Sequence, residues 1–176
     1  MNSMTMKNMW SLHVDEAIVA DRIRKALRKD CEVFFPVNSQ LKDVDLIVHN
    51  LKNHTTKTVQ VKSSKSWKSD GGEYSGQKVP IEKINPKKVD FFIFSCYFEQ
   101  ITRNGAAIET CCVVIPTKKL LEIVKKNKVV KNGICGFSFN LYKKYLGDYG
   151  DLKPHIDKNE GIDFSKYWDN FELPKK

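Results

Sequence analysis

Three polar residues, Asp45, Gln60 and Lys62, lie in or beside two segments that otherwise have the apolar character of buried β-strands. Asp45 is near the start of VDLIVH, and the other two occupy alternate positions of TKTVQVKS. Because the side chains of a strand alternate between its faces, Gln60 and Lys62 share one face. Carboxylate and amide oxygens bind hard divalent cations, and an adjacent lysine can orient water or neutralise developing negative charge. The residue types are therefore those of metal-assisted hydrolysis, if the fold brings them together.

The two strand segments are predicted to form an antiparallel hairpin. Residues 44–49 and 56–63 are separated by the turn-forming segment NLKNHT. A pairing near the turn would bring the carboxylate, the amide and the lysine to one end of the sheet. Taken singly, each of the three is equally typical of a solvent-facing position at a strand edge or turn. The hypothesis of a site therefore depends on their convergence.

An amphipathic helix is predicted upstream, over residues 12–29. Glu16 falls on its apolar side, four residues after Leu12 and three before Val19. A carboxylate in this position is unusual, so Glu16 is a candidate fourth member of the site; the alternative is a side chain that extends past the apolar stripe into solvent. The apolar residues that define this side, at about 100° per residue, are Leu12, Val19, Ile23, Ala26 and Leu27.

The rest of the chain predicts a single α/β domain, with a central mixed β-sheet flanked by helices. The polar, glycine-containing segment 65–76 is predicted to be a loop. We expect an N-terminal extension over residues 1–11, a core over 12–146, and an irregular C-terminal tail over 147–176 that packs on the core. Further strands are predicted at 31–36, 89–98, 107–116 and 137–142, with helices beginning at 117 and over 165–171.

Glu16, Asp45 and the tripeptide Gln60-Val61-Lys62 together resemble the PD-(D/E)XK nuclease superfamily, which has the restriction-endonuclease-like fold. In that superfamily an acidic residue opens one strand, and an acidic residue, an apolar residue and a lysine follow on the next. An upstream helix often contributes a glutamate. The resemblance covers residues 12–64 by motif, and the order of later elements extends it to about residue 126.

The sequence departs from the superfamily pattern at two places. Gln60 stands where an acidic residue is usual, as it does in the endonuclease subunits of certain transposases. A glutamine oxygen can still bind Mg²⁺ but brings no negative charge, so activity would depend on Glu16 as the second carboxylate. The superfamily also commonly has a helix after the lysine strand, whereas the glycines and prolines between residues 71 and 86 leave room for only a short one.

The resemblance implies a metal-dependent endonuclease that hydrolyses DNA phosphodiester bonds with Mg²⁺ or Mn²⁺. Lys62 would be the catalytic lysine. Asp45, Gln60, Glu16 and the backbone carbonyl of Val61 would be the metal ligands, and a cation held there would polarise the phosphate and lower the pKa of bound water. Flanking residues predicted to contact nucleic-acid phosphates are Lys57, Ser63, Ser64, Lys65 and Lys68.

Composition agrees with a basic intracellular protein. The formal net charge is +9, which favours polyanions such as DNA or RNA. The five cysteines contain no CxxC motif and lie among apolar residues, so we expect reduced buried thiols and a cytoplasmic location. The N-terminus has no apolar signal-peptide core, and no apolar segment approaches the roughly 20 residues of a membrane span, so no membrane partner is expected.

Several alternatives stay open at this point. The chain could be a catalytically inactive nucleic-acid-binding module on the same fold, or a protein-interaction or immunity-type domain whose positive charge is only surface. DNA is preferred to RNA as the partner without excluding RNA, and a homodimer is left open. Trp67 and Tyr74 could stack on bases. His49 and His54 superficially suggest an HNH-type nuclease, but they lie at the predicted turn without metal-ligand spacing.

Overall fold

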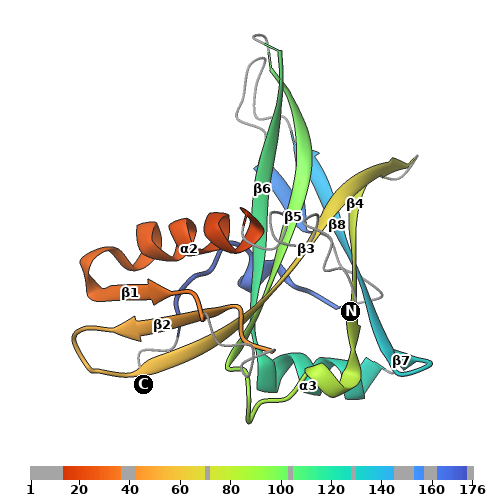
Figure 1. Cartoon of the computed structure of the whole chain (residues 1–176). Helices are drawn as coiled ribbons and strands as arrows, with labels where there is room; N and C mark the ends of the chain where they lie inside the picture. Colours follow the sequence, from red (N-terminus) through yellow and green to blue (C-terminus); the bar gives the residue numbers. More distant parts are fainter. Residues whose placement is uncertain are drawn as a thin grey trace, which may run out of the picture.

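One long strand, β3 (Thr56–Ser69), connects the parts of a single α/β domain (Figure 1). The computed structural model describes residues 14–36, 43–69, 72–102, 105–127, 130–144, 153–156 and 162–173. The other elements are α2 (Val14–Leu27), β1 (Cys31–Phe34), β2 (Leu46–Asn50), β4 (Gly72–Pro80), β5 (Phe91–Thr102), β6 (Gly105–Pro116), α3 (Thr117–Asn127), β7 (Val130–Lys131), β8 (Ile134–Lys144) and β9 (Lys153–Ile156), with short 3₁₀ turns at Arg28–Asp30, Ile81–Lys83 and Ser165–Tyr167.

The described strands form one mixed sheet, which confirms the predicted fold class. β3 pairs antiparallel with β2 and β4 but parallel with β5, and β5 pairs antiparallel with β6 along its full length. β4 continues the sheet to β8, on which β7 and β9 also pair. A parallel neighbour requires a crossover connection, which here runs through β4 and the 3₁₀ turn that follows it.

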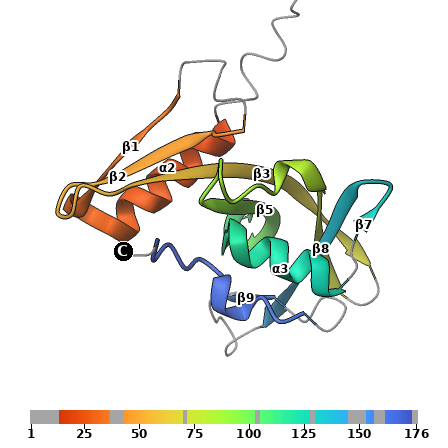
Figure 2. The ribbon, with the colours of Figure 1, turned by 90° about the horizontal axis from the view of Figure 1, so that it is seen from below.

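The two helices cover opposite faces of the β3–β5–β6 part of the sheet. Val19, Ala20 and Ile23 of α2 pack on one face with Val59 and Val61 of β3. On the other face, α3 and the β4–β8 strands enclose a second cluster that is rich in phenylalanine, including Phe92, Phe94, Phe137, Phe139 and Phe164. Figure 2 shows α2 beside β1 and β2 at one end of the molecule and α3 at the other. Because both faces of the sheet are covered, β5 is buried on both sides, which accounts for its continuously apolar sequence.

The structure corrects the predicted boundaries in three places. Residues 65–76, predicted to be a loop, are mostly strand, because β3 continues to Ser69 and β4 begins at Gly72. Pairing with β8 stabilises β4 despite its glycines and polar residues, so tertiary context overrides local propensity. In α2, Ala26 is exposed and Ala20 is buried instead. Only the three-residue turn at Ser165–Tyr167 forms where a short helix was expected.

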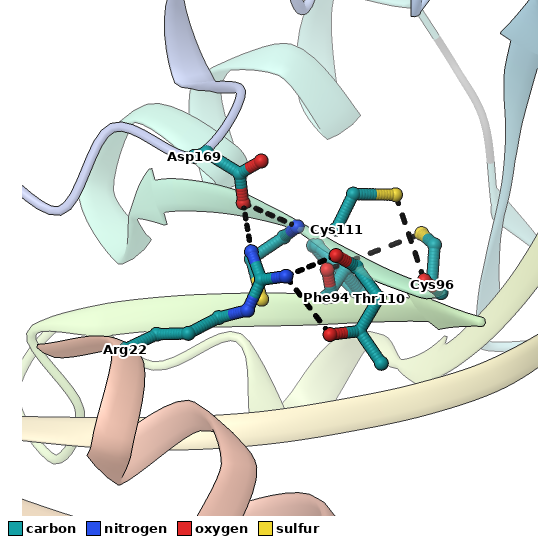
Figure 3. A network of polar contacts seen from close by, with 7 residues as sticks. Arg22, Phe94, Cys96, Thr110, Cys111 and Asp169 are labelled. Atoms are coloured by element: carbon teal, nitrogen blue, oxygen red, sulfur yellow. Dashed lines mark hydrogen bonds and ion pairs between the residues drawn. The ribbon is translucent and has the colours of Figure 1, made fainter. Parts of the chain in front are cut away.

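The C-terminal segment is attached to α2 and β6 by a polar network (Figure 3). Arg22 of α2 forms an ion pair with Asp169, with 2.8 Å between Nη1 and Oδ1, and its second terminal nitrogen donates to both the carbonyl and the hydroxyl oxygen of Thr110. The same Asp169 oxygen accepts the Cys112 N–H at 2.9 Å, and the Asp169 N–H donates to the Cys112 carbonyl at 2.7 Å. Trp168 forms a β-bridge with Val113 and packs against the core, so it anchors this segment.

Residues 1–13, which include the predicted N-terminal extension and Leu12, lie outside the described residues, as does most of the predicted tail before residue 162. The five cysteines are buried and free, as expected. In the part of the chain that the structure describes, no helix is long and apolar enough to cross a membrane.

Candidate active site

The predicted site lies beside β3, immediately before the first residue of β2. Leu46 and Val59 form the last residue pair of the hairpin, at the end away from its turn and not near the turn as predicted. One residue before Leu46, the Asp45 N–H still donates to the Val59 carbonyl at 2.8 Å. The Asp45 carboxylate then accepts the N–H of Val61 at 2.7 Å. The side chain of Asp45 therefore takes the place of a strand partner for the backbone of β3.

Beyond this point one edge of β3 is open. β5 pairs with residues 59–65 of β3, and β2 pairs with the opposite edge only as far as Val59. Among the described residues, that opposite edge has no strand partner from Gln60 to Lys65. The N–H and C=O of one strand residue point to the same edge. Since the Val61 N–H meets Asp45, the Val61 carbonyl is presented on this open edge as well.

Gln60 is buried beside Asp45, with only 3% of its surface exposed. Its amide nitrogen donates to Oδ2 of Asp45, the same oxygen that accepts the Val61 N–H. Its amide oxygen is buried and has no hydrogen-bond partner among the described residues. An unsatisfied buried acceptor costs about 1–3 kcal/mol, so this oxygen is a feature that a ligand would stabilise.

Lys62 lies on the same face of β3 as Gln60 and is half-buried. Burial lowers the pKa of Lys62 from its ordinary value, because desolvation disfavours the charged ammonium group. The carboxylates of Asp45, Asp43 and Glu16 oppose this shift, whereas the charge of Lys83 adds to it. A lysine with a lowered pKa is closer to the neutral form that can accept a proton from water.

Asp45 shows the complementary effect. Burial raises the pKa of the Asp45 carboxyl above its ordinary value, while the hydrogen bond from Val61, the charge of Lys62 and the hydrogen bond from Gln60 lower it in that order. The desolvation of the carboxylate is therefore larger than what its present partners compensate. A cation of higher charge placed beside it would stabilise the ionised form.

Glu16, the predicted helix carboxylate, influences Lys62 through its charge, but its helix lies on the other face of β3. Glu16 lies in the first turn of α2, is half-buried, and raises the pKa of Lys62 through its charge. The helix itself packs on the face of β3 opposite to Gln60 and Lys62. Asp15, the preceding residue of α2, contacts β3 and β5 directly, because it accepts hydrogen bonds from Ser63 Oγ and from the Tyr97 hydroxyl.

Two charged residues near Lys62 were not identified from the sequence. Asp43 lies two residues before Asp45 and forms ion pairs with Lys83 at 3.9 Å and with Lys88 at 3.3 Å. Lys83 lowers the pKa of both Asp45 and Lys62. The Asp-x-Asp spacing of residues 43 and 45 is a signal that could have been noticed. Nothing in the local sequence relates Lys83 to β3, because it follows β4.

The residues predicted to contact phosphates have varied surroundings. Lys57 forms an ion pair with Asp90 at 3.8 Å, and Ser63 donates its hydroxyl hydrogen to Asp15. Ser64 donates to the carbonyl of Lys65 at 3.1 Å. Lys65 is exposed. The side chain of Lys68 lies outside the described part of the chain, so for all five residues phosphate contact stays a prediction.

The donor set around Asp45 suits a hard divalent cation. A buried carboxylate, an unsatisfied amide oxygen at Gln60 and an open-edge carbonyl at Val61 are all oxygen ligands of the kind that Mg²⁺ takes. These residues therefore fit the expected metal, with Glu16 as a supporting carboxylate. Within the described residues, no group of three or more His, Cys, Asp or Glu side chains is arranged to hold a metal ion, so amide and backbone oxygens would have to contribute.

Two open cavities flank β3 at this site. The first, of about 790 Å³, lies on the α2 side and is lined by residues that include Asp15, Trp67 and Tyr97. The second, of about 680 Å³, lies between β3, β4 and β8, and Lys62 lines it. Ser63, Ser64 and Trp67 line both. The part of β3 around Ser63 and Ser64 is thus accessible from each side, whereas Asp45, Gln60 and Val61 line neither of these two cavities.

His49 and His54 do not form an alternative centre with other described residues. His49 lies in β2 and its Nδ1 is 3.1 Å from the hydroxyl of Thr56, while its ring is 6.0 Å from that of His54. Both belong to the hairpin end opposite to Asp45. This arrangement is that of residues at a β-turn, which agrees with the sequence-based preference against an HNH-type site.

Comparison with known proteins gives a limited result. No family model matches the chain, and no curated protein matches it. Among solved structures, the fold is similar to that of a bacterial homing endonuclease, I-Ssp6803I, with a TM-score of 0.37 and 18% sequence identity. The similarity covers 71% of this chain and 76% of that one.

Proposed function

We propose that the chain is a metal-dependent endonuclease of the PD-(D/E)XK type that hydrolyses DNA phosphodiester bonds. The observation that carries this proposal is the convergence of Asp45, Gln60 and Lys62 at the open edge of β3. The partners of the Asp45 carboxylate do not offset its desolvation, and the Gln60 amide oxygen has no hydrogen-bond partner among the described residues. Lys62 is partly desolvated. Residues held in this way are unfavourable for stability and are therefore typical of functional sites.

Each residue has a role that follows from its surroundings. Asp45, Gln60 and the Val61 carbonyl would hold Mg²⁺ or Mn²⁺, with Glu16 in support, and the bound cation would polarise the phosphate and acidify its water. Lys62 accepts a proton from the attacking water or orients it, because its lowered pKa favours the neutral amine. Lys83, paired with Asp43, keeps the positive charge beside Lys62 and so helps to hold that pKa down.

One observation favours a second candidate, a module on the same fold that binds nucleic acid without cleaving it. Oδ2 of Asp45 accepts hydrogen bonds from both Gln60 and Val61, and Gln60 adds no negative charge to the site. A carboxylate oxygen that accepts hydrogen bonds from two groups of the same protein is also what a site without a metal would contain. The two functions are separated by whether the protein cuts.

The test is cleavage of supercoiled plasmid DNA by the purified full-length protein in Mg²⁺ or Mn²⁺, with EDTA as the metal-free arm. We expect nicked or linear product with metal only. Lys62→Ala and Lys62→Arg should each reduce the rate by roughly 10²–10⁴-fold, the usual contribution of general acid–base catalysis. Arginine keeps the charge but cannot act as a base, so it separates the two roles of the lysine.

The matched control is Lys118→Ala, which removes an exposed lysine in the first turn of α3 that lines neither of the two cavities beside β3. Its cleavage rate should equal that of the unmodified protein. Cleavage that persists in Lys62→Ala would show that the lysine is not catalytic. Salt-sensitive binding without any cleavage would identify the inactive module, and the absence of both would leave a protein-interaction domain.

A further inference from the structure

The cavity on the α2 side of β3 has the size and lining of a small-molecule site. Its volume of about 790 Å³ falls within the range of about 300–1,000 Å³ that is typical of such sites. Its walls are mainly apolar, from Val14 and Trp67 to Phe98 and Ile108. No catalytic role proposed above involves this cavity, although Ser63 and Ser64 line both it and the groove that contains Lys62.

Trp67 is placed as a stacking surface at the side of this cavity. The indole is 48% exposed, which is unusual for so large an apolar side chain, and it stacks on Tyr74 of β4 with 6.1 Å between ring centroids and 28° between planes. Its outer edge lies against Gly76, where a Cβ atom would be only 2.8 Å from the ring. The glycine and the tyrosine thus hold the ring in position while part of it stays open to solvent.

Asp15 supplies a hydrogen-bond acceptor in the same cavity. Ser63 donates to one of its oxygens and Tyr97 to the other. Each carboxylate oxygen can accept a further hydrogen bond, because it has two lone pairs. A flat ring that carries an amino group would satisfy both features, with its face on the indole and its amino group toward Asp15.

The cavity is continuous with the candidate active site. Ser63, Ser64 and Trp67 line it together with the groove that contains Lys62, and the edge of β3 between the two has no strand partner among the described residues. Trp67 lies five residues beyond Lys62 on β3, roughly 16 Å along the strand. A nucleic-acid strand whose phosphate lies at Lys62 can therefore place a base a few nucleotides away against Trp67. The exposed Lys65 at the rim favours the polyanionic backbone.

We propose that this cavity binds one unstacked nucleobase of the substrate strand, a few nucleotides from the phosphate at Lys62, with the base against Trp67 and the amino group of a cytosine or adenine directed to Asp15. The proposal deepens the function proposed above and rests on it for the position of the phosphate. Base–aromatic stacking tolerates any base, so Trp67 supplies affinity, whereas Asp15 supplies the preference for amino-bearing bases.

The test measures binding in EDTA, where no cleavage occurs, by fluorescence anisotropy of labelled oligonucleotides of equal length. The three probes are oligodeoxycytidine, oligothymidine and an abasic strand with the same phosphates. The unmodified protein should bind oligodeoxycytidine roughly 5- to 100-fold more tightly than the abasic strand, and more tightly than oligothymidine. Trp67→Ala should abolish the advantage over the abasic strand, and Asp15→Asn should abolish the preference over thymidine.

Two glycines provide a matched pair of variants that leave the tryptophan in place. Gly76→Ala should displace the indole and reduce the base-dependent part of binding, because the new methyl group would meet the ring. Gly136→Ala adds the same methyl group on the neighbouring strand, where nothing lies within 4 Å, and should leave the ratio unchanged. Phe34→Ala, which removes another exposed aromatic residue on β1, should also leave it unchanged.

The outcomes separate this inference from the proposed function. If Lys62-dependent cleavage is found but the ratio of oligodeoxycytidine to abasic binding is the same in Trp67→Ala, the nucleobase site is wrong and the nuclease stands. If Trp67 determines that ratio but no cleavage occurs, the nucleobase site stands on an inactive module. Failure to bind any strand overturns the inference. So does a shift of tryptophan emission with protein concentration alone that is lost in Trp67→Ala, because it would assign the cavity to a second copy of the chain.

Discussion

Asp45 illustrates how one residue can serve function at the expense of stability. It immediately precedes the first residue of strand β2, replaces a strand partner for Val61 and lies beside Gln60, whose own oxygen has no hydrogen-bond partner among the described residues. Burial raises the pKa of its carboxyl even though four groups, Val61, Lys62, Gln60 and Lys83, act to lower it. The folded protein therefore holds a proton on Asp45 more tightly than the unfolded chain does. As a result, the ionised carboxylate destabilises the metal-free protein at neutral pH.

The variant Asp45→Asn tests this balance. It keeps an acceptor for Val61 and Gln60 but removes the charge, so we expect a Tm higher by about 2–4 °C at pH 7 without metal, which corresponds to ~1 kcal/mol for a domain of this size. Because the folded-state pKa is raised, the penalty in the unmodified protein disappears as the pH falls through that pKa, and the two Tm values should converge in acid. Thermal unfolding across pH measures this.

Added Mg²⁺ should reverse the order at neutral pH, because only the carboxylate binds the cation tightly and a ligand of the folded state raises Tm. An Asp45→Asn variant that is less stable than the unmodified protein in EDTA would show that the carboxylate is already well compensated. Loss of cleavage in the same variant would be expected in either case and is not the discriminating measurement.

At the scale of elements, β3 and α2 together determine the geometry of the site. β3 exchanges partners along its length, from β2 at Thr56–Val59 to β4 at Ser66–Ser69, and the open edge lies between these pairings. The first turn of α2 supplies Asp15 and Glu16. The position of α2 is held by Arg22, which joins it to β6 and to the C-terminal segment.

Removal of this connection should loosen the helix. Arg22→Met leaves the Asp169 carboxylate, whose pKa burial already raises, with the Cys112 N–H but without its cation. We expect a loss of stability of about 1.5–3 kcal/mol, the usual value for hydrogen bonds to charged groups. Urea unfolding measures the loss. The control is Lys25→Met on the same helix, which breaks an exposed ion pair with Asp21 and should cost less than about 0.5 kcal/mol. Equal effects would contradict a special role for Arg22.

At the scale of the whole molecule, charge and topology favour a polyanionic partner on one side. The net charge is +9, and the open edge of β3 is bordered by Lys62, Lys65 and, across the groove, Lys78. The release of condensed counterions from the nucleic-acid backbone would then contribute much of the binding affinity. A protein whose positive charge is spread over its surface without a binding role would not contact a fixed set of phosphates.

Salt dependence of DNA binding measures that footprint. We expect log Kobs against log salt concentration to fall with a slope of about −3 to −5, from roughly four or five neutralised phosphates at about 0.9 per contact. Lys65→Ala should reduce the slope by about 1, since it removes one phosphate contact, while Lys118→Ala on α3 should leave it unchanged. Identical slopes for both variants would place the nucleic acid elsewhere on the protein.

The sequence by itself determined part of the secondary structure and the residue types of the candidate site. Alternation within β3 correctly placed Gln60 and Lys62 on one face. The short turn-forming segment between β2 and β3 correctly predicted that the two strands form a hairpin. Continuous apolar runs correctly identified β5 and β6. These predictions succeed because periodicity and turn chemistry are local properties that survive in any fold.

Only the tertiary structure decided which charges meet. The open edge of β3, the approach of Lys83 and Asp43 to Lys62, and the contact of Asp15 with Ser63 and Tyr97 depend on pairings between distant segments. The strand character of residues 65–76 likewise depends on β8, far along the chain. Burial, desolvation and charge proximity are properties of the assembled molecule, and no local pattern encodes them.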